Sequence, residues 1–181
     1  MASRFRQDVY RWAVLYLRRS IADANDLTFA EISRLLYQHM GLRAVGWFRL
    51  GSWFKRQRIP FMPGYIQRRI LRHYGLDIVI GSNIDGGLYI AHPNGTVLSP
   101  NRIGQNCSVI AAITVGMRNE WAFPDIGDNV FIGAGARVLG GITIGDNVVI
   151  GANAVVIHNV PAATTVVGIP ARPTRKEVVV E

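Results

Sequence analysis

The sequence predicts a mainly β protein, with a parallel β-helix over residues 76–181 that follows a small α-helical region over residues 1–75. Three observations predict this arrangement: a six-residue aliphatic repeat in the second part, helical hydrophobic spacing in the first, and a change of net charge between them. Residues 1–75 contain 14 Arg and Lys against 4 Asp and Glu, whereas residues 76–181 contain 6 against 8. The basic character therefore belongs to the first part and favours an acidic partner for it.

The repeat in the second part predicts short strands joined by tight corners. Aliphatic residues recur every six positions: Ile126, Ile132, Val138, Ile144, Ile150 and Val156. A small or apolar residue stands four places after each, and glycine follows in "IGDNV", "IGAGA" and "IGANA". A helix would have a period of 3.6 residues and an ordinary strand a period of two. One strand and one corner per repeat fit the period, so that three repeats form a triangular coil of about 18 residues.

The repeat changes phase at two places. Earlier blocks keep the six-residue step at Ile78, Ile84 and Ile90 and then at Val97, Ile103, Val109 and Val115. One extra residue falls after Ile90, in "HPNGT", and five fall between Val115 and Ile126. We expect the second insertion, "MRNEWAFPD" (Met117–Asp125), to be a loop extending from a coil, where functional residues are frequent.

Residues 1–75 read as four helices. In "RFRQDVYRWAVLYLRR", Val9, Trp12, Leu15 and Tyr16 are expected on one side. "TFAE" (Thr28–Glu31) is a capping box that opens a helix to about Met40. "AVGWFRLGSWFKRQR" forms a third helix that stops before Pro60, and "GYIQRRILRHYG" a fourth that ends at Gly75.

The basic residues of this region leave two interpretations open. They are Arg18, Arg19, Lys55, Arg56, Arg58, Arg68 and Arg69. They form either a solvated face or, with the interleaved Trp and Phe residues, a peripheral contact with an anionic membrane surface. No pattern that reads nucleic-acid bases is visible. The single cysteine, Cys107, is consistent with a buried thiol in a cytoplasmic protein. The uncharged run Asn147–Ala171 is too rich in Gly and Pro to form a transmembrane helix.

Three segments of the second part resemble one known family. "LDIVIGSNIDGGLYIAHPNGTV" has an aspartate, Asp77, fifteen residues before the His-x-x-Gly motif of His92 and Gly95. "PDIGDNVFIGAGARVLGGITIGDNVVIGANAVV" and "VPAATTVVGIPAR" follow it. All three are similar to segments of the serine acetyltransferase branch of the left-handed β-helix, hexapeptide-repeat acyltransferases. The resemblance implies transfer of an acetyl group from acetyl-CoA to a hydroxyl.

A histidine suits this chemistry, because an alcohol must lose its proton as it attacks a thioester and imidazole accepts protons near neutral pH. We expect His92 to be the general base and Asp77, on the same face of the next coil in the simple register, to orient its ring. The alternative is that His92 is an ordinary half-buried histidine. His158 is expected at a corner, and two histidines in the β-helix are too few for the three-histidine metal site of related β-helix enzymes.

The resemblance also implies a homotrimer, or a multiple of it, with acetyl-CoA between neighbouring β-helices. The cofactor groove would be lined by Gly116, Ala134, Ala152, Thr165 and Arg172.

The sequence departs from the serine acetyltransferase pattern at the acceptor. Ala122 and Phe123 stand where that branch has an Arg-His pair, Ala91 stands where it has an aspartate, and "EVVVE" replaces its terminal isoleucine tail. This pattern looks more like the O-acetyltransferases of capsule and exopolysaccharide synthesis. We therefore expect a sugar or polysaccharide acceptor, bound by Asn119, Glu120, Trp121 and Phe123. Two alternatives are a serine O-acetyltransferase and a non-catalytic scaffold.

Overall fold

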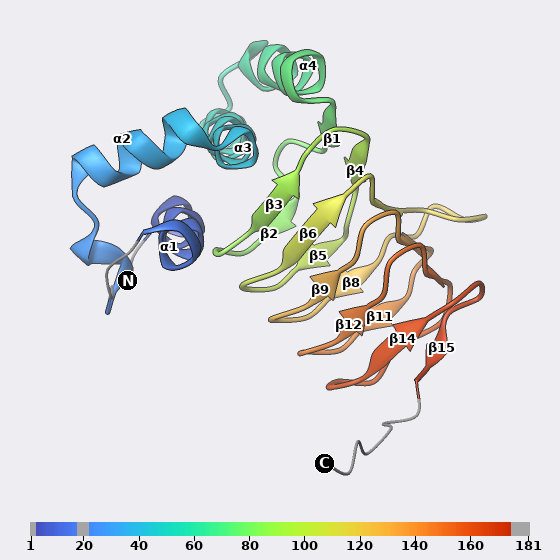
Figure 1. The fold of residues 1–181 in the computed structure, drawn as a ribbon. Helices are drawn as coiled ribbons and strands as arrows, with labels where there is room; N and C mark the ends of the chain where they lie inside the picture. The colour runs from blue at the N-terminus through green and yellow to red at the C-terminus, as the bar shows by residue number, and fades with distance from the viewer. Residues whose placement is uncertain (1–2, 18–21, 175–181) are drawn as a thin grey trace, which may run out of the picture.

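Helices precede a parallel β-helix in the computed structural model, which describes residues 3–17 and 22–174 (Figure 1). The helices are α1 (Arg4–Tyr16), η1 (Ala24–Asp26, a short 3-10 turn), α2 (Phe29–Gln38), α3 (Met40–Arg56) and α4 (Met62–Tyr74). The predicted fold class, a mainly β protein with a small helical N-terminal region, is confirmed. Arg18, Arg19 and the "EVVVE" segment lie outside the described residues.

The strands form the three faces of the β-helix. Sheet 1 contains β1 (Leu76–Ile78), β4 (Thr96–Leu98), β7 (Thr114–Gly116), β10 (Arg137–Leu139) and β13 (Val155–Val156). Sheet 2 contains β2 (Asn83–Ile84), β5 (Arg102–Ile103), β8 (Asp125–Ile126) and β11 (Thr143–Ile144). Sheet 3 contains β3 (Tyr89–His92), β6 (Ser108–Ala111), β9 (Phe131–Ile132), β12 (Val149–Ile150), β14 (Thr165–Val167) and β15 (Arg172–Pro173). Neighbouring strands are parallel except for the closing pair β14–β15.

The strand register confirms the triangular coil. Asp125 pairs with Thr143, Phe131 with Val149 and Arg137 with Val155, one coil further along the chain. The aliphatic residues of the repeat point inward and are buried, as at Ile126, Ile132, Val138, Ile144 and Ile150. Their stacking removes a continuous apolar column from water, which is the main stabilising contribution of such a repeat.

The predicted phase is wrong at one strand. Leu98, and not Val97, is the fully buried aliphatic residue of β4, and it pairs with Ile78 above and Val115 below. Val97 points outward and pairs with Asp77. The physical reason is the corner at Pro93–Gly95, whose extra residues advance the inward position of β4 by one.

The helix predictions hold in type and differ at the ends. Thr28 and Glu31 form the expected capping box, and Gly75 ends α4 in the left-handed conformation. Val9 and Trp12 are buried as expected. Leu15 and Tyr16, however, are 56% and 49% exposed and do not belong to the buried face of α1.

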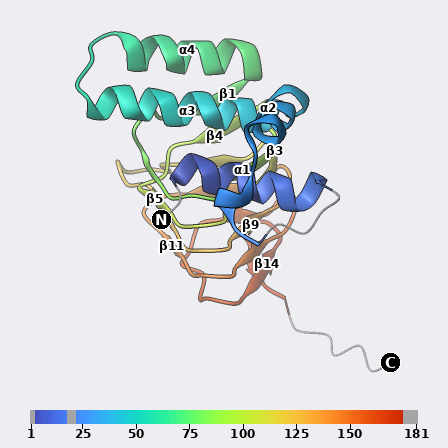
Figure 2. The same ribbon diagram turned by 90° about the vertical axis from the view of Figure 1, so that its left-hand side faces the viewer.

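Helices α3 and α4 cover the first coil of the β-helix. Figure 2 shows them side by side across one end of the molecule. Phe48, Ile66 and Ile70 are buried in the same hydrophobic core as Leu76 and Ile90 of the first coil. A Cβ at Gly41 would collide with the carbonyl of Ile90, so this residue permits the close approach of α3. The division into two domains at residue 75 stays a prediction.

A buried ion pair ties α1 and α3 to the first coil. The carboxylate of Asp8, which has no exposed surface, accepts bonds from Arg49 Nε (2.8 Å) and Nη2 (3.0 Å) and from the backbone N–H of Leu88 (2.8 Å). Arg49 also donates to the carbonyls of Ile84 and Asp85, at 2.6 Å each. The charged groups of Asp8 and Arg49 thus both have hydrogen-bond partners that neighbouring elements hold in place, as a buried charge requires.

Candidate active site

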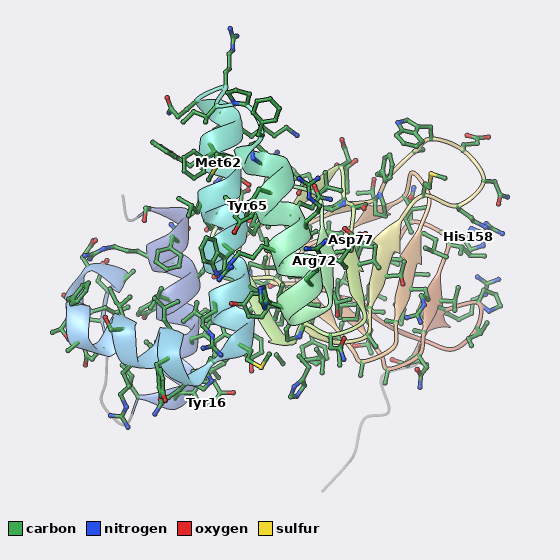
Figure 3. All side chains as sticks on the ribbon, turned by 90° about the horizontal axis from the view of Figure 1, so that it is seen from above. Tyr16, Met62, Tyr65, Arg72, Asp77 and His158 are labelled. Carbon is green, nitrogen blue, oxygen red and sulfur yellow. The ribbon has the colours of Figure 1, made fainter. Side chains whose placement is uncertain are left out.

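The site predicted around His92 lies at the corner between sheets 3 and 1. His92 is the last residue of β3 and is exposed. Asp77 is the half-buried, outward-pointing middle residue of β1, at the junction of α4 and the β-helix (Figure 3). The expectation that they share one face is wrong, because they belong to two sheets that meet at this corner. Within the described residues no hydrogen bond or ion pair joins them.

The backbone of the corner brings the two strands together. The N–H of Gly95 donates to the carbonyl of Gly75 at 3.0 Å, so the segment after His92 is held against the residue that leads into β1. Gly75 has a φ of 62°, and a Cβ at that position would collide with the side chain of Asn94. The glycines of the corner are thus required for the approach of His92 to the start of β1.

Small residues continue along this edge below His92. Ala111 pairs with His92, and its carbonyl accepts from Gly135 at 2.8 Å. Ala134 in turn accepts from Asn153, which follows Ala152, at 2.8 Å. Two of the predicted cofactor residues, Ala134 and Ala152, therefore lie on the same edge as His92. Their small side chains leave the backbone accessible to an extended ligand.

A cation that the sequence analysis overlooked lies beside this edge. Arg137 is half-buried on β10, and its Nη1 donates to the carbonyls of Ala112 (2.7 Å) and Gly135 (2.8 Å). Its position follows from the strand register, since it points outward below Thr114. The one sequence signal for Arg137 is its place in the "GARVLG" segment, where the repeat puts a charged residue at an outward-facing position.

The other predicted cofactor residues lie elsewhere. Gly116 borders an apolar groove on sheet 1, Thr165 is exposed on β14, and Arg172 lines a small cavity of about 80 Å³ with His158 near the end of the β-helix. A single chain thus does not bring all five residues to one pocket.

Residues 117–124 of the Met117–Asp125 segment form a loop, as predicted, which extends from the corner between sheets 1 and 2 (Figure 1), and Asp125 begins β8. Its two aromatic residues, Trp121 and Phe123, contact each other edge to face at 5.3 Å. They line an apolar groove of about 620 Å³ with Val97, Thr114 and Gly116 of sheet 1.

The polar residues of the loop line a different cavity. Asn119 and Glu120 border a space of about 230 Å³ with Arg118, Ala122 and the Leu139–Ile142 turn. The four predicted acceptor residues are therefore divided between two hollows. Arg118, which the sequence analysis did not select, places a positive charge in the same cavity as Glu120.

Other reactive groups lie away from these hollows. Burial raises the pKa of the Cys107 thiol to about 12, so this residue is a structural thiol rather than a nucleophile. Across residues 3–17 and 22–174, no group of three or more His, Cys, Asp or Glu side chains could hold a metal ion. None of the helices in that part of the chain has the length and hydropathy needed to cross a bilayer.

Known proteins match this chain in sequence. Residues 123–158 match the family model described as bacterial transferase hexapeptide (six repeats). A serine acetyltransferase from Synechococcus elongatus is 36% identical over 142 residues, which are 76% of this chain and 58% of that protein. One from Staphylococcus xylosus is 45% identical over 148 residues, which are 79% of this chain and 68% of that protein. The chain spans little more than half of the first relative.

Solved structures match as well. The serine acetyltransferase of Neisseria gonorrhoeae in complex with serine has a TM-score of 0.80 at 29% identity, over 95% of this chain and 68% of that chain. A serine acetyltransferase in complex with CoA has a TM-score of 0.79 at 26% identity, over 94% of this chain and 68% of that chain.

These relatives contradict the predicted similarity to capsule and exopolysaccharide O-acetyltransferases, and with it the sugar or polysaccharide acceptor. That prediction rested on a neutral site at Ala91, Ala122 and Phe123. Its physical flaw is that the same loop presents Arg118 and Glu120 to one cavity, so neutral residues at those three positions do not make a neutral site. The chain belongs to the serine acetyltransferase family of hexapeptide-repeat proteins.

Proposed function

We propose that this protein is an acetyl-CoA-dependent serine O-acetyltransferase. The observation that carries the proposal is the 45% identity to a serine acetyltransferase over 148 residues, which are 79% of this chain. Relatives solved with serine and with CoA support the two substrates.

In the proposed reaction His92 acts as the general base. The serine hydroxyl oxygen attacks the thioester carbon while His92 takes the hydroxyl proton. The tetrahedral intermediate then expels sulfur, the C–S bond breaks, and the proton passes from His92 to the sulfur. The products are O-acetylserine and the free thiol of CoA. Asp77, at the same corner, stabilises the imidazolium electrostatically.

Serine carries a carboxylate and an ammonium group, and a confined site must answer both charges. We assign these roles to Arg118 and Glu120, because both line the cavity of about 230 Å³ under the loop. Asn119 supplies a further hydrogen-bonding group. Trp121 and Phe123 line the apolar groove beside it, where they exclude water from the acetyl group.

The two halves of the proposed site are at opposite edges of sheet 1. His92 is at the corner with sheet 3, and the loop is at the corner with sheet 2. They meet if His92 of one copy faces the loop of the next, as in a trimer or a multiple of it. Acetyl-CoA would then lie along the His92 edge, over Ala134 and Ala152, with Gly116, Thr165 and Arg172 contributed by the faces that border the groove.

A substrate panel tests the proposal. The purified chain is assayed for thiol release from acetyl-CoA with serine, threonine and neutral monosaccharides, and the product is identified by mass spectrometry. We expect O-acetylserine to form and the monosaccharides to give only the background hydrolysis rate. Acetylation of a monosaccharide with no turnover of serine would contradict it.

A further inference from the structure

The α3–α4 hairpin carries an unbalanced charge. From Met40 to Gly75 there are eight Arg and Lys residues and no Asp or Glu. Three of the eight are engaged within the molecule: Arg49 with Asp8, Lys55 with the carbonyl of Ile80, and Arg69 over the ring of Trp47. Of the other five, Arg43 is half-buried, and Arg56, Arg58, Arg68 and Arg72 are exposed.

Large apolar side chains are exposed at the turn of this hairpin, which we call the hairpin tip (residues 53–65). Phe61 is 89% exposed, Tyr65 53%, Trp53 46% and Ile59 36%. Figure 2 shows the turn between α3 and α4 projecting past the edge of the β-helix, and Figure 3 shows Met62 and Tyr65 at the same end. The exposed apolar residues are thus at the part of the hairpin furthest from the core, surrounded by arginines.

The backbone of the tip holds Phe61 outward. Phe61 has a φ of 67° and Arg58 a φ of 56°, a conformation that bulky residues rarely adopt. Phe61 is also the N-cap of α4, with no side-chain cap and no acidic residue in the first turn. The free N–H groups of that turn add positive potential at the tip. Glycine or asparagine would adopt this turn with less strain than phenylalanine. The stability of the fold therefore does not explain why an exposed phenylalanine stands here, and strain of this kind is typical of functional positions.

We propose that the hairpin tip binds the surface of an anionic lipid bilayer, with Phe61, Ile59 and Trp53 entering the interface and Arg56, Arg58 and Arg68 contacting phosphate groups. Exposed aromatics flanked by arginines are the composition of interfacial helices. A second copy of this hairpin is a poor occupant, because a two-fold contact would bring the uncompensated arginines of both copies together. The proposal is independent of the reaction at His92.

Vesicle sedimentation tests the proposal. The intact protein is mixed with vesicles of phosphatidylcholine alone or with phosphatidylglycerol, at low and at high salt. We expect binding only to the anionic vesicles and a loss of binding as salt rises. Quenching of Trp53 fluorescence by brominated lipid should accompany it, and Trp53→Phe should remove that part of the quenching.

Variants separate the tip from the rest of the basic surface. Phe61→Asn fits the left-handed backbone and should weaken binding about tenfold by removing a buried phenylalanine. Arg56→Gln and Arg58→Gln should each weaken it about fivefold. The matched controls are Phe29→Asn and Arg34→Gln, since both residues are exposed on α2 at the opposite end of α3 (Figure 2).

Three results would overturn the proposal. The first is an absence of binding to anionic vesicles at low salt. The second is an equal loss of binding in the tip variants and in the α2 controls. The third is a change of oligomeric mass in Phe61→Asn without vesicles, which would assign the tip to a contact between copies. Thermal unfolding of each variant verifies that the fold is kept.

Discussion

At the scale of single residues, the role of His92 gives the most direct prediction. His92→Ala should lower kcat by roughly 10²–10⁴-fold, because it removes the general base that takes the hydroxyl proton. Asp77→Asn should have a smaller effect, since it changes the stability of the imidazolium and leaves the base in place. Thiol release from acetyl-CoA with serine measures both. His158→Ala is the control, and near-full activity in His92→Ala would exclude the base.

Arg118 gives the second prediction, and it concerns the acceptor alone. Arg118→Gln should raise the KM for serine by about 10- to 100-fold, because a charge-assisted bond to the carboxylate is lost. The KM for acetyl-CoA should not change. Arg102→Gln is a matched control, since that arginine is exposed on β5 and pairs with Asp85 at 3.4 Å. A parallel rise of both KM values would assign Arg118 to the fold of the loop instead.

These residues also show what the sequence could and could not predict about the site. The Asp77 and His92 motif was visible because its spacing is local. Arg118 was overlooked because a charged residue in a loop has no periodicity, and only the folded loop places it in one cavity with Glu120. The relation of Asp77 to His92 depends on the length of the first coil: Asp77 pairs with Val97, so His92 is reached before the coil is complete and lies on the preceding sheet.

At the scale of the elements, the buried pair of Asp8 and Arg49 sets the position of α1 and α3 on the first coil. Asp8→Ala should lower the free energy of unfolding by about 3–5 kcal/mol, because it leaves the Arg49 charge buried and unpaired. Arg4→Gln is the control: Arg4 pairs with Asp85 at 2.8 Å but is partly exposed, so its loss should cost less than about 1 kcal/mol. Urea unfolding measures both, and equal effects would refute the special role of the buried pair.

The junction of α2 and α3 gives a pH-dependent prediction. His39 packs on Trp12 and Tyr16, with ring centroids at 4.7 and 4.2 Å, and burial lowers its pKa below the ordinary 6.5. The unfolded chain therefore binds a proton near pH 6 that the folded protein does not. The free energy of unfolding should fall as the pH falls from about 6.5 through the folded pKa of His39. The stabilisation from neutral His39 should be fully present above about pH 6.5. The urea midpoint of His39→Gln should depend less on pH across this range than that of the wild-type protein. An equal dependence in both proteins would contradict the assignment of the effect to His39.

The elements themselves were predicted where a local signal exists. The capping box at Thr28 and the glycine at Gly75 fixed two helix ends, because each satisfies backbone groups with neighbouring residues. The sequence predicts that α3 begins at Ala44, whereas it begins at Met40, because its N-cap His39 makes no side-chain hydrogen bond that a sequence motif would indicate. The exposure of Leu15 was missed because the position of α1 depends on the long-range pair of Asp8 and Arg49.

At the scale of the whole molecule, the distance between the two halves of the site has a consequence for assembly. Sheet 1 separates the His92 edge from the loop, so neither half completes the other within one chain. A closed ring of identical copies solves this, because each interface joins the His92 edge of one subunit to the loop of the next. We therefore expect light scattering to give a trimer or a multiple of it.

Complementation between two impaired variants tests this arrangement more strictly than mass alone. In a trimer that mixes His92→Ala and Arg118→Gln subunits at random and in equal amounts, about one quarter of the interfaces combine an intact His92 with an intact Arg118. Unfolding and refolding the two variants together should thus give about a quarter of the wild-type rate at a serine concentration near the wild-type KM, where sites that lack Arg118 contribute little. Refolding each variant alone is the control: His92→Ala should stay nearly inactive, and Arg118→Gln should keep only the low rate that its raised KM for serine allows. If both halves of the site belonged to one chain, every subunit of the mixture would carry one defect, and the mixed protein would be no more active than its components.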